Sequence, residues 1–265
     1  MPIQINVPPA NELSSETSFA TARPRREWTG TGRLAVVRPP NRWYLRGKAV
    51  AEYFLAALLS VMSLPIIAIC ALAVKLTSPG PAFYSQTRVG KGGRLFAIRK
   101  IRTMVHNCES LTGPRWCLPG DPRITKVGWF LRISHLDELP QLFNVLRGEM
   151  ALIGPRPERP EFVPQLERAL PAFRQRLMIL PGVTGLAQVR LPADTDIDSV
   201  RRKLAHDLWY IERMSAWLDL RVLMATALYA IGMRRSAGIP GSSAIERSMQ
   251  SVVGEPLTQR GRLSA

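Results

Sequence analysis

The longest apolar segment of the chain runs without a charge from Tyr53 to Val74. A straight helix of about 22 residues reaches about 33 Å at 1.5 Å per residue, which is enough to cross a bilayer core. Pro65 stands near its middle, where proline removes a backbone donor and kinks a helix. Basic residues flank both ends: Arg38, Arg42, Arg46 and Lys48 before the segment, and Lys75, Arg88, Lys91 and Arg94 after it.

Positive charge on both sides favours a cytoplasmic position for both flanks. The pattern therefore predicts a helix that enters the membrane, breaks near Ser63 to Pro65 and returns to the same face. An ordinary kinked span and a buried core helix of a soluble protein remain alternatives.

The polar and apolar alternation after this segment predicts a β-hairpin. One strand ends at Val89, the residues Gly-Lys-Gly-Gly at 90–93 form the turn, and the second strand runs from Arg94 to about Met104. Side chains two residues apart share a face of a strand, so Arg94, Lys100 and Arg102 form one basic stripe. The stripe could bind phosphates, or face solvent or lipid headgroups.

The second half of the chain shows helical spacing. Thr125 is placed to cap a helix, and Val200, Leu204, Leu208 and Ile211 lie on one side of a helical pattern over 199–233. The part of that pattern after Ala216 is apolar but contains Asp219 and Arg221, which suggests an interfacial or core position. We therefore expect an α-rich α+β fold with a re-entrant membrane helix, a small hairpin and interfacial amphipathic helices. The expected segments are a basic flexible tail (1–46), the membrane helix (47–76), a catalytic domain (77–233) and a flexible C-terminal tail (234–265).

The charge balance narrows the class of partner. Lys and Arg number 36 against 20 Asp and Glu, and the isoelectric point is near 10.9. This excess favours nucleic acid, anionic lipid or phosphorylated substrates. An aromatic content of 7% together with the apolar segment argues against nucleic acid. Neither Cys70, Cys108 and Cys117 nor the three histidines have the spacing of a disulfide framework or a zinc site.

An acidic pair, Asp137-Glu138, stands between apolar residues in "SHLDELPQLFNVLRGEMALIGPRPE". Ser134 and Asp137 have the spacing of a capping box, and Pro140 suits a first helical turn, which predicts that both acids lie at a helix N-terminus. Adjacent helical residues point about 100° apart, so one carboxylate could attack a substrate while the other binds a divalent metal. The alternative is that both acids only stabilise the helix N-terminus.

Two arginines accompany the pair. Arg132 precedes it by five residues, and Arg156 stands between two prolines in "GPRPE". Arginines held beside carboxylates suit a phosphate-bearing substrate whose charge is neutralised by arginine and metal.

From about Ala51 to Met233 the chain resembles the bacterial sugar transferases, which are membrane-monotopic polyprenyl-phosphate phosphoglycosyl transferases. The matching stretches are "SPGPAFYSQTRVGKGGRLFAIRKIRTM", "DPRITKVGWFLR", "LDELPQLFNVLRGEMALIGPRPERPEFV", "PGVTGLAQV" and "HDLWYIERMSAWLDLRVLMATA". The resemblance implies transfer of a sugar 1-phosphate from a UDP-sugar to undecaprenyl phosphate, with release of UMP and with Mg²⁺ as cofactor. It also implies a re-entrant helix in the bacterial inner membrane and a catalytic domain on the cytoplasmic face.

The resemblance also assigns roles. Asp137 would be the nucleophile and Glu138 a metal ligand, with Asp137 beside the same metal. Arg132 and Arg156 would bind phosphate or nucleotide, as would Lys100, Arg102 and Arg123 in the matching stretches. Departures occur at Trp129, His135 and residues 190–192, so the sugar is not identified.

The expected partners are a UDP-sugar, undecaprenyl phosphate and membrane lipid, but no nucleic acid, and a homo-oligomer is left open. Two alternatives remain: a non-catalytic membrane scaffold of a polysaccharide assembly machine, and a glycosyltransferase that would release UDP.

Overall fold

The computed structural model describes residues 36–110, 113, 120–230 and 238–254. The predicted basic tail up to residue 35, Cys117 and parts of the predicted C-terminal tail lie outside these residues. The elements in chain order are α1 (Arg42–Thr77), β1 (Phe83–Val89), η2 (Lys91–Gly93), β2 (Leu95–Ile101), α2 (Lys126–Ile133), η3 (Leu136–Gln141), α3 (Leu142–Leu146), β3 (Ala151–Ile153), α4 (Val163–Ala169), η4 (Pro171–Met178), β4 (Gly182–Thr184), α5 (Leu186–Arg190), α6 (Ile197–Arg213), α7 (Ala216–Ala230) and α8 (Ser242–Val253).

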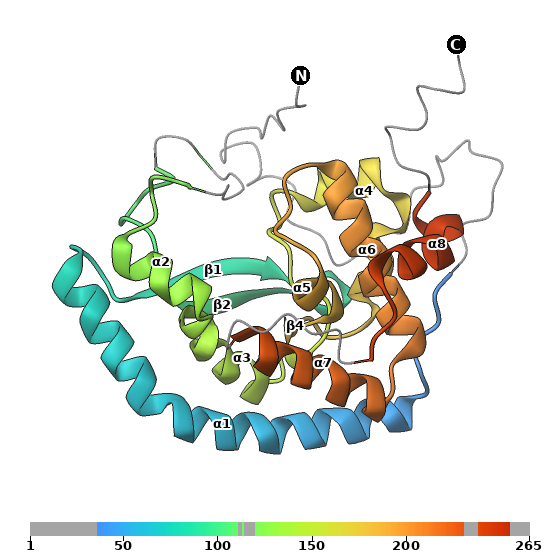
Figure 1. Ribbon diagram of the computed structural model, residues 1–265, viewed down its shortest axis with the longest axis horizontal. Helices are drawn as coiled ribbons and strands as arrows, with labels where there is room; N and C mark the ends of the chain where they lie inside the picture. Colours follow the sequence, from blue (N-terminus) through green and yellow to red (C-terminus); the bar gives the residue numbers. More distant parts are fainter. Residues whose placement is uncertain (1–35, 111–112, 114–119, 231–237, 255–265) are drawn as a thin grey trace, which may run out of the picture.

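The helix α1 lies along one side of the molecule and is bent in its middle (Figure 1). Among the described helices, it is the one long and apolar enough to cross a membrane. One face packs against the rest of the chain through residues spaced three or four apart: Glu52, Ala56, Ser60, Ser63, Ile67, Cys70 and Val74. Large apolar side chains on the other faces are exposed, among them Phe54, Val61, Met62, Ile69 and Leu72.

The predicted break near Pro65 was wrong, because α1 continues as one helix from Arg42 to Thr77. Proline removes one donor and bends the helix without ending it. In the turn before the proline, the Ser63 hydroxyl donates to the Ser60 carbonyl at 3.0 Å. The helix also begins at Arg42, inside the segment that the sequence pattern placed in the basic tail.

The hairpin prediction is confirmed. β1 and β2 pair antiparallel with Tyr84 opposite Lys100, and a glycine-rich turn joins them. Behind the hairpin, Ile101 packs with Leu131 of α2 and with Ile67, Cys70 and Val74 of α1. The far half of the apolar helix thus supports the hairpin directly.

The main core surrounds α6, whose predicted apolar side is confirmed: Val200, Leu204, Leu208 and Ile211 are all buried. A capping box starts this helix, since the Ser199 N–H donates to the Asp196 carboxylate and the Asp196 N–H donates to the Ser199 hydroxyl. The pattern over 199–233 is two helices, α6 and α7, because Met214 leaves the helical conformation and the Ser215 hydroxyl accepts from the Leu218 N–H.

The prediction of a flexible C-terminal tail was wrong for its middle part, where α8 packs against α6. Its buried side chains Ile245, Met249 and Val252 follow helical spacing. That spacing is visible in the sequence, but it is short and separated from the other periodic segments.

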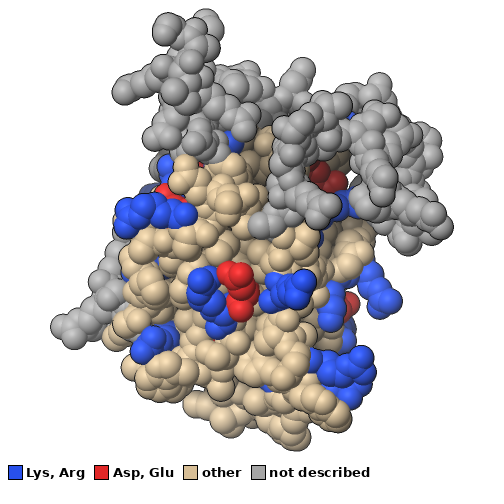
Figure 2. Space-filling view, turned by 90° about the vertical axis from the view of Figure 1, so that its right-hand side faces the viewer, with Lys and Arg blue, Asp and Glu red and all other residues tan. Residues whose placement is uncertain are grey.

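The lower margin of the molecule, where α1 and α7 run, is mostly uncharged, and Lys and Arg side chains stand above it (Figure 2). The exposed large apolar residues of α7 are Trp217, Leu220 and Met224, and those of α2 are Trp129, Phe130 and Ile133. Both helices therefore present apolar side chains to the outside, as an interfacial position requires.

Candidate active site

A cavity of about 870 Å³ lies over the face of the hairpin that carries Tyr84 and Lys100. All of the side chains predicted for the site line this one cavity, although they come from separate parts of the chain: Lys100, Arg102, Arg123, Arg132, Asp137, Glu138 and Arg156.

The acidic pair stands in the first turn of η3, as predicted, but the capping box does not form. Ser134 ends α2 instead, and its hydroxyl donates to the Phe130 carbonyl at 2.8 Å. His135 then takes a left-handed conformation with φ 56°, which turns the chain from α2 into η3. The two leucines that flank the acids, Leu136 and Leu139, pack on the cluster behind the hairpin that includes α1. The apolar neighbours of the acids therefore pack them against α1.

Glu138 is held by two cations. Lys100 Nζ lies 2.7 Å from its Oε1, and the Arg156 guanidinium donates to both oxygens, at 2.5 Å and 3.1 Å. Burial alone would raise the pKa of Glu138, but Arg156 and Lys100 outweigh burial and keep the pKa well below its usual value. Glu138 is therefore ionised across the physiological pH range.

Asp137 has a different environment, although it is the adjacent residue. It is 6% exposed and lines the cavity, and within the described residues no hydrogen bond or ion pair holds its carboxylate. Burial and the neighbouring Glu138 charge raise the pKa of Asp137 to about 6, against the opposing effect of Lys100, Arg156 and Arg132. At neutral pH this carboxylate is mostly ionised, and it faces the cavity with no partner among the described residues that would compete with a substrate.

The remaining predicted arginines line the cavity, but their guanidinium groups differ in what they bind. Arg132 Nε donates to the Thr103 hydroxyl at 2.8 Å, and its charge acts on Asp137. Arg123 forms an ion pair with Asp121 at 2.6 Å. Arg102 donates to the Pro79 and Ser78 carbonyls, which ties the end of α1 to the hairpin. The third member of the predicted basic stripe, Arg94, ends the glycine-rich turn before β2 and is not among the described residues that line the cavity.

Sequence reasoning missed several polar residues of the cavity, among them Tyr84, Arg88, Glu109 and Arg159. Arg88 and Tyr84 project from β1 on the same side as Lys100, and period-two spacing on the first strand would have found them. Arg159 forms a bidentate ion pair with Glu109, with N–O distances of 2.8 and 3.0 Å. No sequence signal indicates that pair, because 50 residues separate its members.

The donor set fits one small hard cation. Within the described part of the chain, no group of three or more His, Cys, Asp or Glu side chains could hold a metal ion. Mg²⁺ characteristically takes one or two carboxylates and completes its shell with water and substrate phosphates. The open Asp137 carboxylate beside Glu138 meets that requirement, and zinc would need more protein ligands.

The chain is similar to known proteins over most of its length. The sequence model of the family described as bacterial sugar transferase matches residues 43–232. The chain is 44% identical over 173 residues to a UDP-N-acetylgalactosamine-undecaprenyl-phosphate N-acetylgalactosaminephosphotransferase of Aeromonas hydrophila, and this match covers 65% of the chain but 41% of the relative. It is 44% identical over 181 residues to a UDP-glucose:undecaprenyl-phosphate glucose-1-phosphate transferase of Caulobacter vibrioides, which covers 68% of the chain and 67% of the relative.

A third relative is the exopolysaccharide production protein PSS of Rhizobium leguminosarum, which is 38% identical over 169 residues, covering 62% of the chain and 84% of the relative. The chain thus spans less than half of the Aeromonas relative and most of the Rhizobium relative. The family match includes α1, the hairpin, the acidic pair and the Pro-Arg-Pro turn. The chain belongs to the bacterial sugar transferase family.

Proposed function

We propose that the protein transfers a sugar 1-phosphate from a UDP-sugar to undecaprenyl phosphate and releases UMP. The observation that carries this proposal is the contrast within the acidic pair: Asp137 is open to the cavity, while Lys100 and Arg156 hold Glu138. The names of the Aeromonas and Caulobacter relatives, both undecaprenyl-phosphate sugar transferases, support the same substrate classes.

The reaction has two displacements at one phosphorus atom. An Asp137 oxygen attacks the phosphorus that carries the sugar, the bond from that phosphorus to the bridging oxygen breaks, and UMP leaves with the electron pair. A phosphate oxygen of the lipid then attacks the same phosphorus, which restores the Asp137 carboxylate and yields a diphosphate-linked lipid sugar. Two steps with a covalent intermediate allow one site to serve a water-soluble donor and a membrane-bound acceptor.

The cationic side chains of the cavity reduce the repulsion between the attacking carboxylate and the diphosphate, which is the main barrier to the reaction. Lys100, Arg132 and Arg156 line the same cavity as the nucleophile, so they can balance phosphate charge in a partly buried setting. Asp137 and Glu138 would hold Mg²⁺, which when bound neutralises phosphate charge further. Arg156 has the planar fork that suits phosphate oxygens, and its side chain is 32% exposed.

The test is nucleotide release by the detergent-solubilised full chain, given Mg²⁺, undecaprenyl phosphate and a panel of UDP-sugars. We expect UMP with one sugar, dependent on the lipid phosphate and lost on chelation with EDTA. UDP in place of UMP would show a glycosyltransferase. Absence of both nucleotides across the panel would favour a non-catalytic scaffold for a polysaccharide assembly machine.

The protein lies on the cytoplasmic face of the bacterial inner membrane, with α1 dipping into the bilayer and both of its ends on one side. The bend in α1, the basic residues at both of its ends and the exposed tryptophans of α2 and α7 support this placement. In a chain without its own cysteines, Arg46→Cys and Thr77→Cys provide exposed labels at the two ends. We expect an impermeant maleimide to reach both from the same side of sealed vesicles, and labelling from opposite sides would establish an ordinary span.

A further inference from the structure

The Pro-Arg-Pro-Glu turn that presents Arg156 is held through its carbonyl groups. The carbonyl of Pro155 accepts from the Gly182 N–H at 2.9 Å and that of Glu158 accepts from the Val89 N–H at 2.9 Å. The Arg156 carbonyl accepts from Arg176 Nη2 at 2.7 Å, and the Pro157 carbonyl accepts from Arg88 Nη1 at 3.1 Å. Because two of these four residues are prolines without an N–H, the turn depends on outside donors for its position.

Of these donors, we single out Arg176, whose buried side chain has contacts on several sides. It lies on η4, and its side chain is 3% exposed. Besides the Arg156 carbonyl, its guanidinium contacts the Asp207 carboxylate at 2.7 Å and Glu158 Oε1 at 3.3 Å, and its Cζ stands 5.1 Å from the centre of the Phe173 ring. Contacts on several sides leave one orientation for a planar guanidinium.

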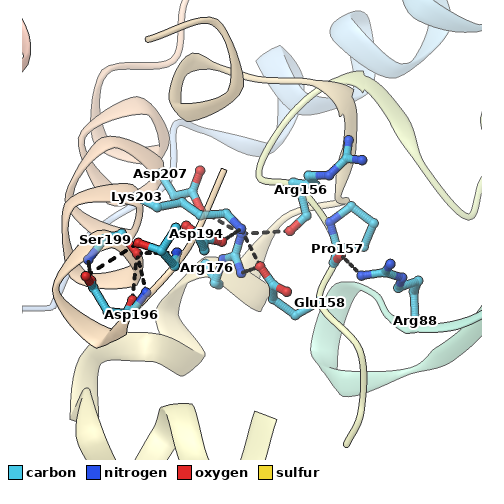
Figure 3. A network of polar contacts seen from close by, with 11 residues as sticks. Arg88, Arg156, Pro157, Glu158, Arg176, Asp194, Asp196, Ser199, Lys203 and Asp207 are labelled. Atoms are coloured by element: carbon cyan, nitrogen blue, oxygen red, sulfur yellow. Dashed lines mark hydrogen bonds and ion pairs between the residues drawn. The ribbon is translucent and has the colours of Figure 1, made fainter. Parts of the chain in front are cut away.

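A buried charge network surrounds this guanidinium (Figure 3). Lys203 of α6 bridges Glu158 at 2.5 Å and Asp194 at 2.7 Å, and Asp207 lies one turn further along the same helix. Burial alone would raise the pKa of Glu158, but Lys203 and Arg176 keep it below its usual value. Glu158 therefore stays charged at neutral pH, and its ion pair with Lys203 ties the turn to α6.

Arg176 is not among the residues that line the cavity within the described part of the chain. Arg176 reaches the site through two contacts: the main chain of Arg156, whose guanidinium binds Glu138 beside the nucleophile, and the carboxylate of Glu158, which lines the cavity. We propose that Arg176 is a positioning residue that holds Arg156 in place for the transfer reaction, an inference that rests on the proposed function.

The substitution Arg176→Lys keeps the positive charge but replaces a planar fork by a single ammonium group, which cannot reach all three partners at once. A shift of the turn by about 1 Å is of the size that lowers turnover by roughly 10²-fold. We expect UMP release by this variant to fall by about 10- to 100-fold in kcat. The matched control is Arg174→Lys on the same element, where the side chain is 47% exposed and binds Glu167; it should match the wild type.

A double-mutant cycle separates positioning from a general structural role. If Arg176 acts through Arg156, then Arg176→Lys should cause little further loss of kcat in an Arg156→Ala background. The same loss in both backgrounds, or wild-type turnover of the single variant, would overturn the inference while leaving the proposed function intact. No UMP from the wild type with any UDP-sugar would overturn both.

A second variant covers the case in which Arg176→Lys does not fold. Asp207→Asn keeps the shape and one acceptor oxygen but removes the charge beside Arg176 Nη2, the nitrogen that donates to the Arg156 carbonyl. A smaller loss of kcat that disappears in the Arg156→Ala background supports the inference. Unchanged turnover, or a loss that persists in that background, contradicts it.

Discussion

The substitution Asp137→Asn is expected to abolish UMP release, with a loss of at least roughly 10⁴-fold, the order seen when a covalent nucleophile is removed. An amide oxygen is too weak a nucleophile to displace UMP, and within the described residues no other carboxylate side chain stands open and unbound beside Glu138. The exchange keeps the size of the side chain and breaks no hydrogen bond or ion pair within the described residues, so the fold should persist. The matched control is Asp198→Asn on α6, which makes the same chemical change outside the cavity.

Two further readouts test the same assignment. Incubation of the wild type with its UDP-sugar but without lipid should add the mass of a sugar phosphate to the protein, and the Asp137→Asn variant should gain none. Attack requires the ionised carboxylate, and the pKa of Asp137 is raised to about 6, first by burial and then by Glu138. The wild-type kcat/KM should therefore fall as pH decreases through about 6, since Glu138 stays ionised there. An intermediate in the Asp137→Asn protein would refute the nucleophile assignment.

The second large effect is expected in stability, from Glu52→Leu in the apolar helix. The Glu52 carboxylate accepts from Lys48 at 2.6 Å and from the backbone N–H groups of Leu152 and Ile153 at 3.2 and 3.1 Å. Both side chains of the Lys48–Glu52 pair are less than 10% exposed. Removing one member of a buried ion pair costs about 3–5 kcal/mol, and here the N–H groups of Leu152 and Ile153 also lose their acceptor.

We expect Glu52→Leu to lower the thermal unfolding midpoint in detergent by about 10 °C, at about 2–4 °C per kcal/mol for a chain of this size. Asp219 also binds Lys48, at 2.8 Å, and accepts from the Tyr44 and Tyr210 hydroxyls, so part of the network remains. The control is Glu212→Leu, whose pair with Arg213 is 44–46% exposed and should contribute less than about 1 kcal/mol. Equal midpoints for both variants would show that Glu52 does not join α1 to β3 in the way the contacts indicate.

Local patterns determined much of the framework. Alternation and a glycine-rich turn predicted the β1–β2 hairpin, and helical spacing predicted the buried side of α6. Thr125 caps α2 as expected, since its side chain accepts from the Gly128 N–H. These features depend on a few neighbouring residues, so the sequence contains all the information needed to predict them.

The errors have equally local causes. Pro65 predicts a break in the helix, but a single lost donor only bends it. Ser134 and Asp137 have capping-box spacing, but Ser134 already serves the end of α2, and a left-handed His135 starts the next element. The short apolar pattern of α8 was overlooked because flanking polar segments suggested a tail.

By itself, the sequence determined the family, the apolar helix and the acidic pair with its arginines, because each is a contiguous motif whose chemistry is set by residue type. Only the tertiary structure decided that Asp137 faces the cavity without a partner while Lys100 and Arg156 hold Glu138. It also decided that Arg176 binds the Arg156 carbonyl and that Glu52 binds the Ile153 N–H shortly before the turn, although both are distant from the turn in sequence. The physical reason is that the pKa of a carboxylate and the position of a turn depend on burial and on charges brought together by folding, which spacing along the chain does not encode.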